Sequence, residues 1–512
     1  MNSTHRRSVL LAGLLAVHGG PSSAQEAGEA DVTPANSAGA RVIDAGARVI
    51  DEAWVLATLK EKNPSLRAAG LELAQAREAT HLEEGKFPYT FQADGSYSRL
   101  RAPQWSSDTS SSSQGDTMVL GSQLSRMFPT GTTATLRAEG QYLSSQDASA
   151  LAMSGLTGGS AYQTTLRATL TQALLGGYGS TVNLASLRAA RISEQKQQKT
   201  LDLRTSELLR DALLGYWEFW YAHEAVAIQA DALALTKAQL READLRVAHG
   251  QLAAADALKF RTQVASLTES LINAKAAFVT AGAQLGRLVG VVEPFAAWEP
   301  SSQPPNLREL PAVAAVLGRL RARSPVLAEP IEALRLAREK RRTSGDDYRA
   351  RLDASTWVET SGVGSGRLAP ALRQTGTLGT VSVFAGLTFQ NTLDDQRLRA
   401  ARAQASHAVA LAEANLDVST QQLESDAVQT WQKAEQASAI LQAANQTVDI
   451  ASQQAENERQ RFSLGANTYL DVQVAEDTLR QARLRVLRAK VDRAKASIML
   501  DHLAGELVGV GP

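Results

Sequence analysis

Long stretches without helix-breaking residues constrain this chain most. Residues 396–464 contain neither Gly nor Pro, and residues 181–249 contain only Gly215. Both stretches are rich in Ala, Leu, Gln, Glu and Arg, which favour the helical state. At about 1.5 Å per residue, each predicts a helix of roughly 100 Å. Because the core of a globule is shorter than that, each helix must bury an apolar stripe against neighbouring helices.

The two stretches belong to an internal repeat. At a constant offset of 215 residues, similar residues align without a gap; the pairs include Leu208 with Leu423, Asp211 with Asp426, Arg246 with Arg461, Gly250 with Gly465, Asp256 with Asp471 and Gly290 with Gly505. Upstream, an offset of 261 aligns Pro64 with Pro325. The first copy therefore carries 46 extra residues between about 90 and 180.

Shorter helices flank each long one. Residues 253–289 and 55–86 both show helical composition, and together they have about the length of one long helix. Two half-length helices stacked end to end beside a full-length helix, in both copies, would give four columns of equal height. The turns at Gly250 and Gly465 would then lie at one end of the columns.

Segments that predict strands connect the helices at the other end. Apolar and polar residues alternate within 88–175 and again within 350–390, although Trp357 and Phe384 interrupt the second polar face. The extra residues add a further hairpin over 117–144, with strands around 118–126 and 133–142 joined by the turn "FPTG" at 128–131. Each protomer therefore has four or six strands.

These strands fit either a β-sandwich or a transmembrane barrel. Their length of about 10 to 14 residues is close to that needed to cross a bilayer at a tilt. Since four to six strands cannot close a barrel, which needs about eight, several chains must contribute to one.

The N-terminus predicts export. Arg6 and Arg7 precede the apolar residues 9–17, and small residues end at Ala24, so we expect a signal peptide over 1–24; the paired arginines leave both the general and the twin-arginine routes open. No later segment has the apolar length of a membrane-spanning helix. After the signal peptide we expect a linker (25–54), a first repeat (55–290), a second linker (291–311) and a second repeat (312–507). The first repeat contains long helix 181–249 and helix 253–289, and the second repeat contains long helix 396–464 and helix 468–505.

Composition excludes several functions. The 53 basic residues equal the 53 acidic ones, which argues against a nucleic-acid partner. There is no cysteine, so disulfides, Cys-ligated metals and a lipid-acceptor cysteine are excluded. No phosphate loop, nucleophile elbow or zinc-binding helix motif is present, and His407 and His502 stand alone, where a solvated or packed histidine is expected. We therefore predict no enzyme activity, cofactor or metal.

Three segments resemble the TolC-like outer-membrane efflux proteins: "NPSL" at 63–66, "LTQALLGGYGSTVN" at 170–183 and "RFSLGANTYLDV" at 461–472. The resemblance covers about residues 50–507. It implies an α+β membrane protein in which three protomers form one outer-membrane β-barrel, continued by a long α-helical barrel in the periplasm. It further implies a passive exit duct for a tripartite efflux pump or type I secretion system, with a periplasmic adaptor and an inner-membrane transporter as partners.

The resemblance also implies site residues at the periplasmic tip. Asp471 matches the acidic position of the constriction, and Asp256 is its counterpart in the other hairpin. A helix cap is the alternative role for Asp471 and the favoured role for Asp256. The adaptor contacts implied at the two turns are Arg246, Gly250, Arg461, Leu464, Gly465 and Asn467. Asn467 and Val474 depart from the Arg and second Asp of the family pattern, so the gating mechanism and the cargo stay open. A diffusion porin would explain only the strands, and a periplasmic coiled-coil scaffold only the helices.

Overall fold

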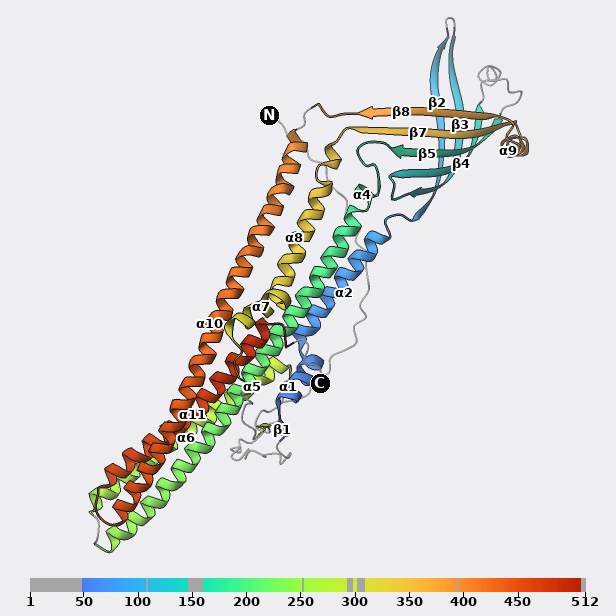
Figure 1. Ribbon diagram of the computed structural model, residues 1–512. Coiled ribbons are helices and arrows are strands. Elements are labelled where there is room, and N and C mark those ends of the chain that lie inside the picture. The colour runs from blue at the N-terminus through green and yellow to red at the C-terminus, as the bar shows by residue number, and fades with distance from the viewer. Residues whose placement is uncertain are drawn as a thin grey trace, which may run out of the picture. The chain divides into compact units, whose positions relative to one another are not determined.

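The computed structural model describes residues 48–106, 109–145, 160–250, 253–291, 298–301, 309–393 and 396–507 (Figure 1). The predicted signal peptide and residues 25–47 of the expected linker lie outside these ranges. The helices are α1 (Glu52–Lys62), α2 (Pro64–Glu84), α4 (Ser180–Asn183), α5 (Ala185–Ala248), α6 (Ala254–Val289), α7 (Val313–Arg323), α8 (Pro325–Thr343), α9 (Leu368–Gly376), α10 (Gln396–Ser463) and α11 (Tyr469–Leu503). The strands are β1 (Arg48–Ile50), β2 (Tyr89–Ser106), β3 (Thr109–Met127), β4 (Thr132–Ser145), β5 (Ser160–Ala173), β6 (Trp298–Pro300), β7 (Arg351–Ser365) and β8 (Val381–Gln390).

The two long helices continue without a break, as their composition predicts. Helix α5 has 64 residues and α10 has 68. Helix α5 packs along its length against α2 and α6, and α10 packs against α8 and α11. Further contacts of α5 with α8 and α11 join the two halves of the chain. Every long helix therefore has the neighbours that its apolar stripe requires.

Local chemistry divides the segment 55–86, which we expected to be one helix. Helix α1 ends at Lys62, and the Asn63 side chain caps α2 by accepting a hydrogen bond from the Leu66 N–H at 3.0 Å. Pro64 takes the first position of α2, where its missing N–H costs nothing. The expected linkers also contain structure, because β1 and β6 pair in parallel. Helix α9 is a further element that we did not predict, within the region assigned to strands 350–390.

The half-length helices meet end to end through glycines. Gly290 ends α6 with φ of 84°, and a Cβ atom there would lie 2.6 Å from the Lys62 carbonyl oxygen. The Asn63 amide donates to the Leu288 carbonyl at 2.6 Å, which fixes the junction. In the second half, Gly505 has φ of 74°, and a Cβ atom there would lie 2.6 Å from the Arg323 carbonyl oxygen. Both junctions therefore require a residue without a side chain.

An aromatic core supports the first junction. Tyr216, Trp217, Phe219 and Trp220 of α5 are all buried and pack with residues of α1, α6 and α11. The second half places Trp431 at the corresponding position of α10, where its indole N–H donates to the Pro311 carbonyl at 2.8 Å. The largest side chains therefore lie where one long helix is covered by the ends of two short ones.

The long strands form one antiparallel sheet in the order β2-β3-β4-β5-β7-β8. The extra hairpin of the first repeat, which we bounded at 117–144, lies inside this sheet as β3 and β4, so the sheet has six strands and not four. Helices α2, α5, α8 and α10 reach the sheet at one end, and the hairpin turns lie at the other ends of the long helices α5 and α10 (Figure 1).

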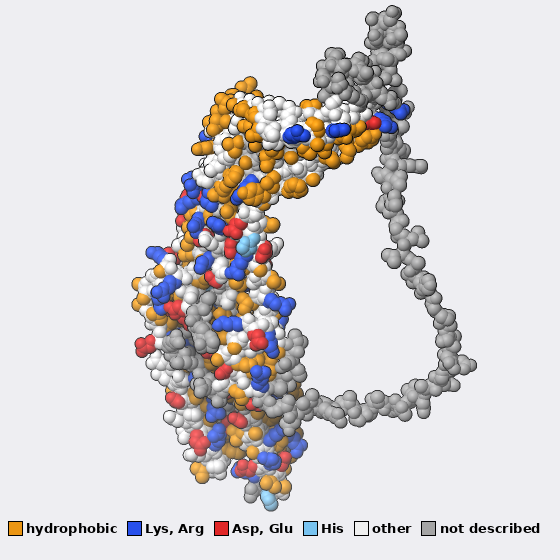
Figure 2. Space-filling model, turned by 90° about the vertical axis from the view of Figure 1, so that its right-hand side faces the viewer, with side chains coloured by type: hydrophobic (Ala, Val, Ile, Leu, Met, Phe, Trp, Pro, Cys, Tyr) orange, Lys and Arg blue, Asp and Glu red, His pale blue; other side chains and the backbone are white. Residues whose placement is uncertain are grey.

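One face of the sheet is apolar and open to the outside. One row in register crosses all six strands; it consists of Phe91, Leu124, Leu136, Ala168, Val358 and Val383. Phe91 and Val383 are each 69% exposed. Hydrophobic side chains gather over the sheet in Figure 2, whereas the helices carry mixed charges. Because a soluble sandwich would bury such a face, the sheet suits a lipid environment.

The opposite face is polar and carries cross-strand ion pairs. Arg137 pairs with Asp94 at 3.1 Å and with Glu139 at 2.8 Å, and Arg167 pairs with Glu359. Trp357 and Phe384, which interrupt the polar pattern, stack on each other with ring centroids 5.6 Å apart. The Arg167 guanidinium lies 4.9 Å from the Trp357 ring centroid, so the aromatic pair is part of this polar network.

Gly290→Ala tests the end-to-end junction. The left-handed backbone and the close Lys62 carbonyl predict a loss of about 1 to 3 kcal/mol in the free energy of unfolding. Gly318→Ala is the control, because Gly318 is a helical residue of α7 with open space around it, and we expect a small gain there. Denaturant unfolding in detergent measures both; equal stabilities would contradict the close contact.

His502 predicts a pH dependence of stability. Its ring is buried between Ser206 (2.7 Å) and Arg210 (3.1 Å), and since a guanidinium only donates, Nε2 must accept and Nδ1–H must donate to Ser206. Burial, and then the Arg210 charge, lower the His502 pKa to about 4 against the attraction of Glu207 and Asp211. Because the folded state resists protonation, stability is complete above pH ~6.5 and falls as the pH drops from there toward ~4.

The expected loss is up to about 3 kcal/mol, at ~1.4 kcal/mol for each pKa unit. Thermal unfolding between pH 7 and 4 measures it. His502→Gln removes the titrating group, so its melting temperature should depend less on pH than that of the wild type; parallel profiles would contradict this role.

Candidate functional site

The candidate site is the end of the two helical hairpins, where α5 turns into α6 and α10 turns into α11. Gly250 and Gly465, the two predicted turn residues, both have φ of 72° with open space around their Cα atoms. Glycine is therefore required for the left-handed backbone and not for a close contact. The two repeated glycines thus have the same φ.

An aromatic cluster holds the two hairpins together just behind the turns. Phe260 of α6 and Tyr469 of α11 are buried, with ring centroids 3.5 Å apart, and they pack on Ala243 of α5. Phe462 of α10 joins them, and the Arg246 guanidinium lies 5.5 Å from its ring centroid. All four helices of the tip thus contribute to one cluster. Phe462 and Tyr469 lie within the motif at 461–472, but the sequence analysis gave them no role, and it did not identify Ala243 or Phe260.

The predicted basic and turn residues have different environments. Arg246 pairs with Glu242 at 2.5 Å, and Arg461 pairs with Glu458 at 3.4 Å. The Asn467 amide donates to the Glu458 carbonyl at 3.0 Å, so it ties the turn back to α10. Leu464 has no such constraint and is 83% exposed. Of the predicted contact residues, Leu464 is thus the apolar side chain presented to the outside.

Asp471 caps α11 and keeps its charge at the surface. Its Oδ2 atom accepts hydrogen bonds from the Thr468 N–H at 2.9 Å and from the Thr468 hydroxyl at 2.7 Å. These two hydrogen bonds lower the pKa of the exposed carboxyl, with a smaller contribution from Arg461. The residue is therefore ionised at neutral pH, and capping and a role as a surface charge are compatible. Asp256 lies at the third position of α6, but its side chain is outside the described part of the structure.

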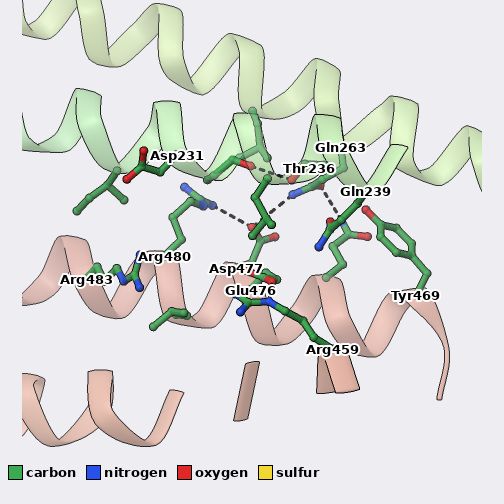
Figure 3. A pocket seen from close by; sticks show the side chains of 16 residues that line it. Asp231, Thr236, Gln239, Gln263, Arg459, Tyr469, Glu476, Asp477, Arg480 and Arg483 are labelled. Atoms are coloured by element: carbon green, nitrogen blue, oxygen red, sulfur yellow. Dashed lines mark hydrogen bonds and ion pairs between the residues drawn. The ribbon is translucent and has the colours of Figure 1, made fainter. Parts of the chain in front are cut away.

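A polar network further along the helices also links the hairpins (Figure 3). It encloses a cavity of about 90 Å³. Gln263 of α6 donates to Asp477 at 3.3 Å and accepts from Gln473 at 2.6 Å. Arg480 donates to Gln229 of α5 at 3.2 Å and pairs with Asp477 at 3.3 Å. These contacts hold α11 against α5 and α6.

The sequence did not reveal this network because it has no counterpart in the other repeat. At the offset of 215 residues, Gln263 aligns with Thr478, and Asp477 aligns with Thr262. On the α10 side, Arg459 pairs with Glu476, and this pairing raises the Arg459 pKa. The network is therefore a feature that distinguishes the two hairpins.

Neither a metal centre nor a membrane-spanning helix appears among the described residues. No group of three or more His, Cys, Asp or Glu side chains is arranged to hold an ion in that part of the chain. The helices that the structure describes are all too polar or too short to cross a bilayer.

Residues 316–506 match a protein family described as outer membrane efflux protein. No curated protein sequence matches the chain significantly. Among solved structures, a membrane protein from Pseudomonas aeruginosa is similar with a TM-score of 0.65 and 15% identity, over 88% of this chain and 93% of that one. The outer membrane protein VceC from Vibrio cholerae has a TM-score of 0.62 and 15% identity, over 89% of this chain and 96% of that one. The open state of the MtrE outer membrane channel from Neisseria gonorrhoeae has a TM-score of 0.61 and 17% identity, over 89% of this chain and 88% of that one. The expected fold of long helices and antiparallel strands is thus confirmed.

Phe260→Ala tests the aromatic cluster. Removal of this 2% exposed ring should cost about 3 to 5 kcal/mol of local packing and increase amide hydrogen exchange at both turns. Leu464→Ala is the matched control, since it truncates an exposed apolar side chain of the same tip and should leave exchange unchanged. Equal amide hydrogen-exchange rates at the turns in Phe260→Ala and Leu464→Ala would contradict the role of the aromatic cluster.

Proposed function

We propose, from the match of residues 316–506 to the outer membrane efflux protein family, that the chain belongs to this family and that three copies form one continuous exit duct. The duct consists of a β-barrel in the outer membrane and a barrel of α-helices in the periplasm. It conducts cargo passively, while an inner-membrane transporter supplies the energy and a periplasmic adaptor connects the two. The family and its place in the outer membrane agree with the expectation from the sequence.

The observation that carries the proposal is a six-stranded sheet that cannot be complete in one protomer. Its edge strands β2 and β8 each pair with one neighbour only, β3 and β7 respectively, so the outer side of each is unpaired among the described residues. Its apolar face is exposed, and its opposite face carries charged residues. Three such sheets joined edge to edge would give 18 strands, with the apolar face toward lipid and the polar face toward the duct. The alternative of 12 strands would require β3 and β4 to leave the sheet.

The helical end supports the same arrangement. Each protomer contributes two hairpins, so three protomers place six turns in a ring around the periplasmic mouth. Asp471 and Asp256 begin the returning helices of these turns. Carboxylates gathered at a narrow mouth attract cations and repel one another, so we propose that Asp471 forms the selective constriction. The turn residues Arg246, Gly250, Arg461, Leu464, Gly465 and Asn467 form the proposed adaptor contact.

The constriction can be separated from helix capping by single-channel recording. Asp471→Asn retains a hydrogen-bond acceptor but removes the charge, so we expect reduced cation selectivity in a planar bilayer. Thr468→Ala removes the hydroxyl hydrogen bond to Asp471 while the backbone N–H bond and the Asp471 charge remain, so we expect the selectivity to remain. Loss of selectivity in Thr468→Ala alone would assign the effect to the cap.

Cross-linking tests the closed sheet, and the absence of cysteine makes the chain suitable for it. One cysteine placed along β2, at Gln92 or a neighbouring position, and another along β8, near Ser382, should yield covalent trimers on oxidation. Each single-cysteine variant is the control and should stay monomeric. If every pair of positions scanned gives only monomers or disulfide-linked dimers, the edge-to-edge trimer is contradicted.

A further inference from the structure

A basic pocket lies where the helices meet the sheet. It has a volume of about 450 Å³. Its lining comes from the end of α8 and the loop after it, from the region of α4, and from the beginning of α10. The residues that the argument uses are Tyr178, Arg341, Arg342, Asp346, Arg349 and Arg402.

The charge of this pocket is strongly positive although the chain as a whole is neutral. Four exposed arginines face one acidic residue. That residue, Asp346, is buried and turned inward, because it accepts from the Gly177 N–H at 2.8 Å and pairs with Arg349 at 3.5 Å. Arg342 pairs with Glu339 at 3.1 Å, whereas Arg341 and Arg402 contact no carboxylate within the described ranges.

Helix electrostatics explain part of this charge. Arg341 and Arg342 lie in the last turn of α8, where cations favour the helix dipole. Arg402 stands in the second turn of α10, which Asp394 and Asp395 directly precede in the sequence. The pocket therefore gathers arginines from separate segments of the chain, and together they offer several guanidinium donors to one anion.

Exposed apolar and aromatic side chains occur in the same segments of the chain as the pocket lining. Tyr178 lines the pocket and is 58% exposed, and Tyr348, next to Arg349 in the sequence, is 46% exposed. Leu174 and Leu175, which directly follow β5, are 40% and 44% exposed. Tyrosines beside an apolar strand surface are typical of the boundary between a membrane and water. A ligand of this site would thus have both an anionic and an apolar part.

We propose that this pocket binds the phosphate of an anionic glycerophospholipid in the membrane leaflet nearest to the helices. Arg341 and Arg402 contact the phosphate, and the hydroxyls of Thr343 and Ser406 lie in the same lining. The acyl chains lie on the exposed leucines and tyrosines. This inference rests on the proposed function, because it requires the sheet to lie in a bilayer.

Lipid retention tests the site. The full chain, reconstituted with equal amounts of phosphatidylglycerol and phosphatidylcholine, is purified and its bound lipid is counted by native mass spectrometry. We expect phosphatidylglycerol to be preferred in the wild type, and the preference to fall at least tenfold in the double variant Arg341→Gln/Arg402→Gln. Arg341→Lys/Arg402→Lys keeps the charge and should retain most of it.

The matched control is Lys237→Gln/Arg241→Gln, which removes the same charge from exposed positions of α5 near the tip and should keep the preference. Equal loss in this control, or no preference in the wild type, overturns the site. If inorganic phosphate or glycerol phosphate displaces phosphatidylglycerol at the same concentration as the lipid, the ligand of the pocket is a soluble anion and the lipid proposal is wrong. A protein that conducts in bilayers but shows no preference disproves this inference alone, whereas one that never inserts disproves the proposed function.

Discussion

The whole structure depends on covering two very long helices with shorter ones of the same total length. A helix of 64 or 68 residues exposes an apolar stripe that no single short partner can cover. Here α6 and α2 together cover α5, and α11 and α8 together cover α10. Since two helix ends must meet within each column, both junctions need a close backbone contact, and Gly290 and Gly505 provide it. The largest aromatic side chains surround the first of these junctions.

The same arrangement places the proposed functional surfaces at the two ends of the helical part. The sheet adjoins one end of each of α2, α5, α8 and α10, so its apolar face and the basic pocket lie at that end of the helical part. The turns at Gly250 and Gly465 lie at the other, where Phe260, Tyr469 and Phe462 bind the hairpins together. Asp471 is fixed there by Thr468 and remains exposed, so its local role as a cap orients the charge that the proposed constriction needs.

Features that repeat along the chain could be predicted from the sequence. The absence of Gly and Pro predicted both long helices to within a few residues, and period-two alternation predicted the strands, including the hairpin that became β3 and β4. The break at Asn63 was predictable in principle from the capping residue and Pro64, although we expected one helix there. The pairing of β1 with β6, and helix α9, depend on tertiary contacts that short segments do not encode. The network of Gln263, Asp477 and Arg480 was hidden for a related reason, because it joins residues more than 200 positions apart and occurs once.

The central claim is that three incomplete sheets close into one barrel above one helical duct. Electron cryo-microscopy of the purified protein in lipid nanodiscs measures this directly. The account predicts a threefold-symmetric particle with 18 strands in the membrane, β2 of one protomer paired with β8 of the next, and six hairpin turns around the distal mouth. A barrel of 12 strands with β3 and β4 outside it, or a particle without a closed barrel, would contradict it.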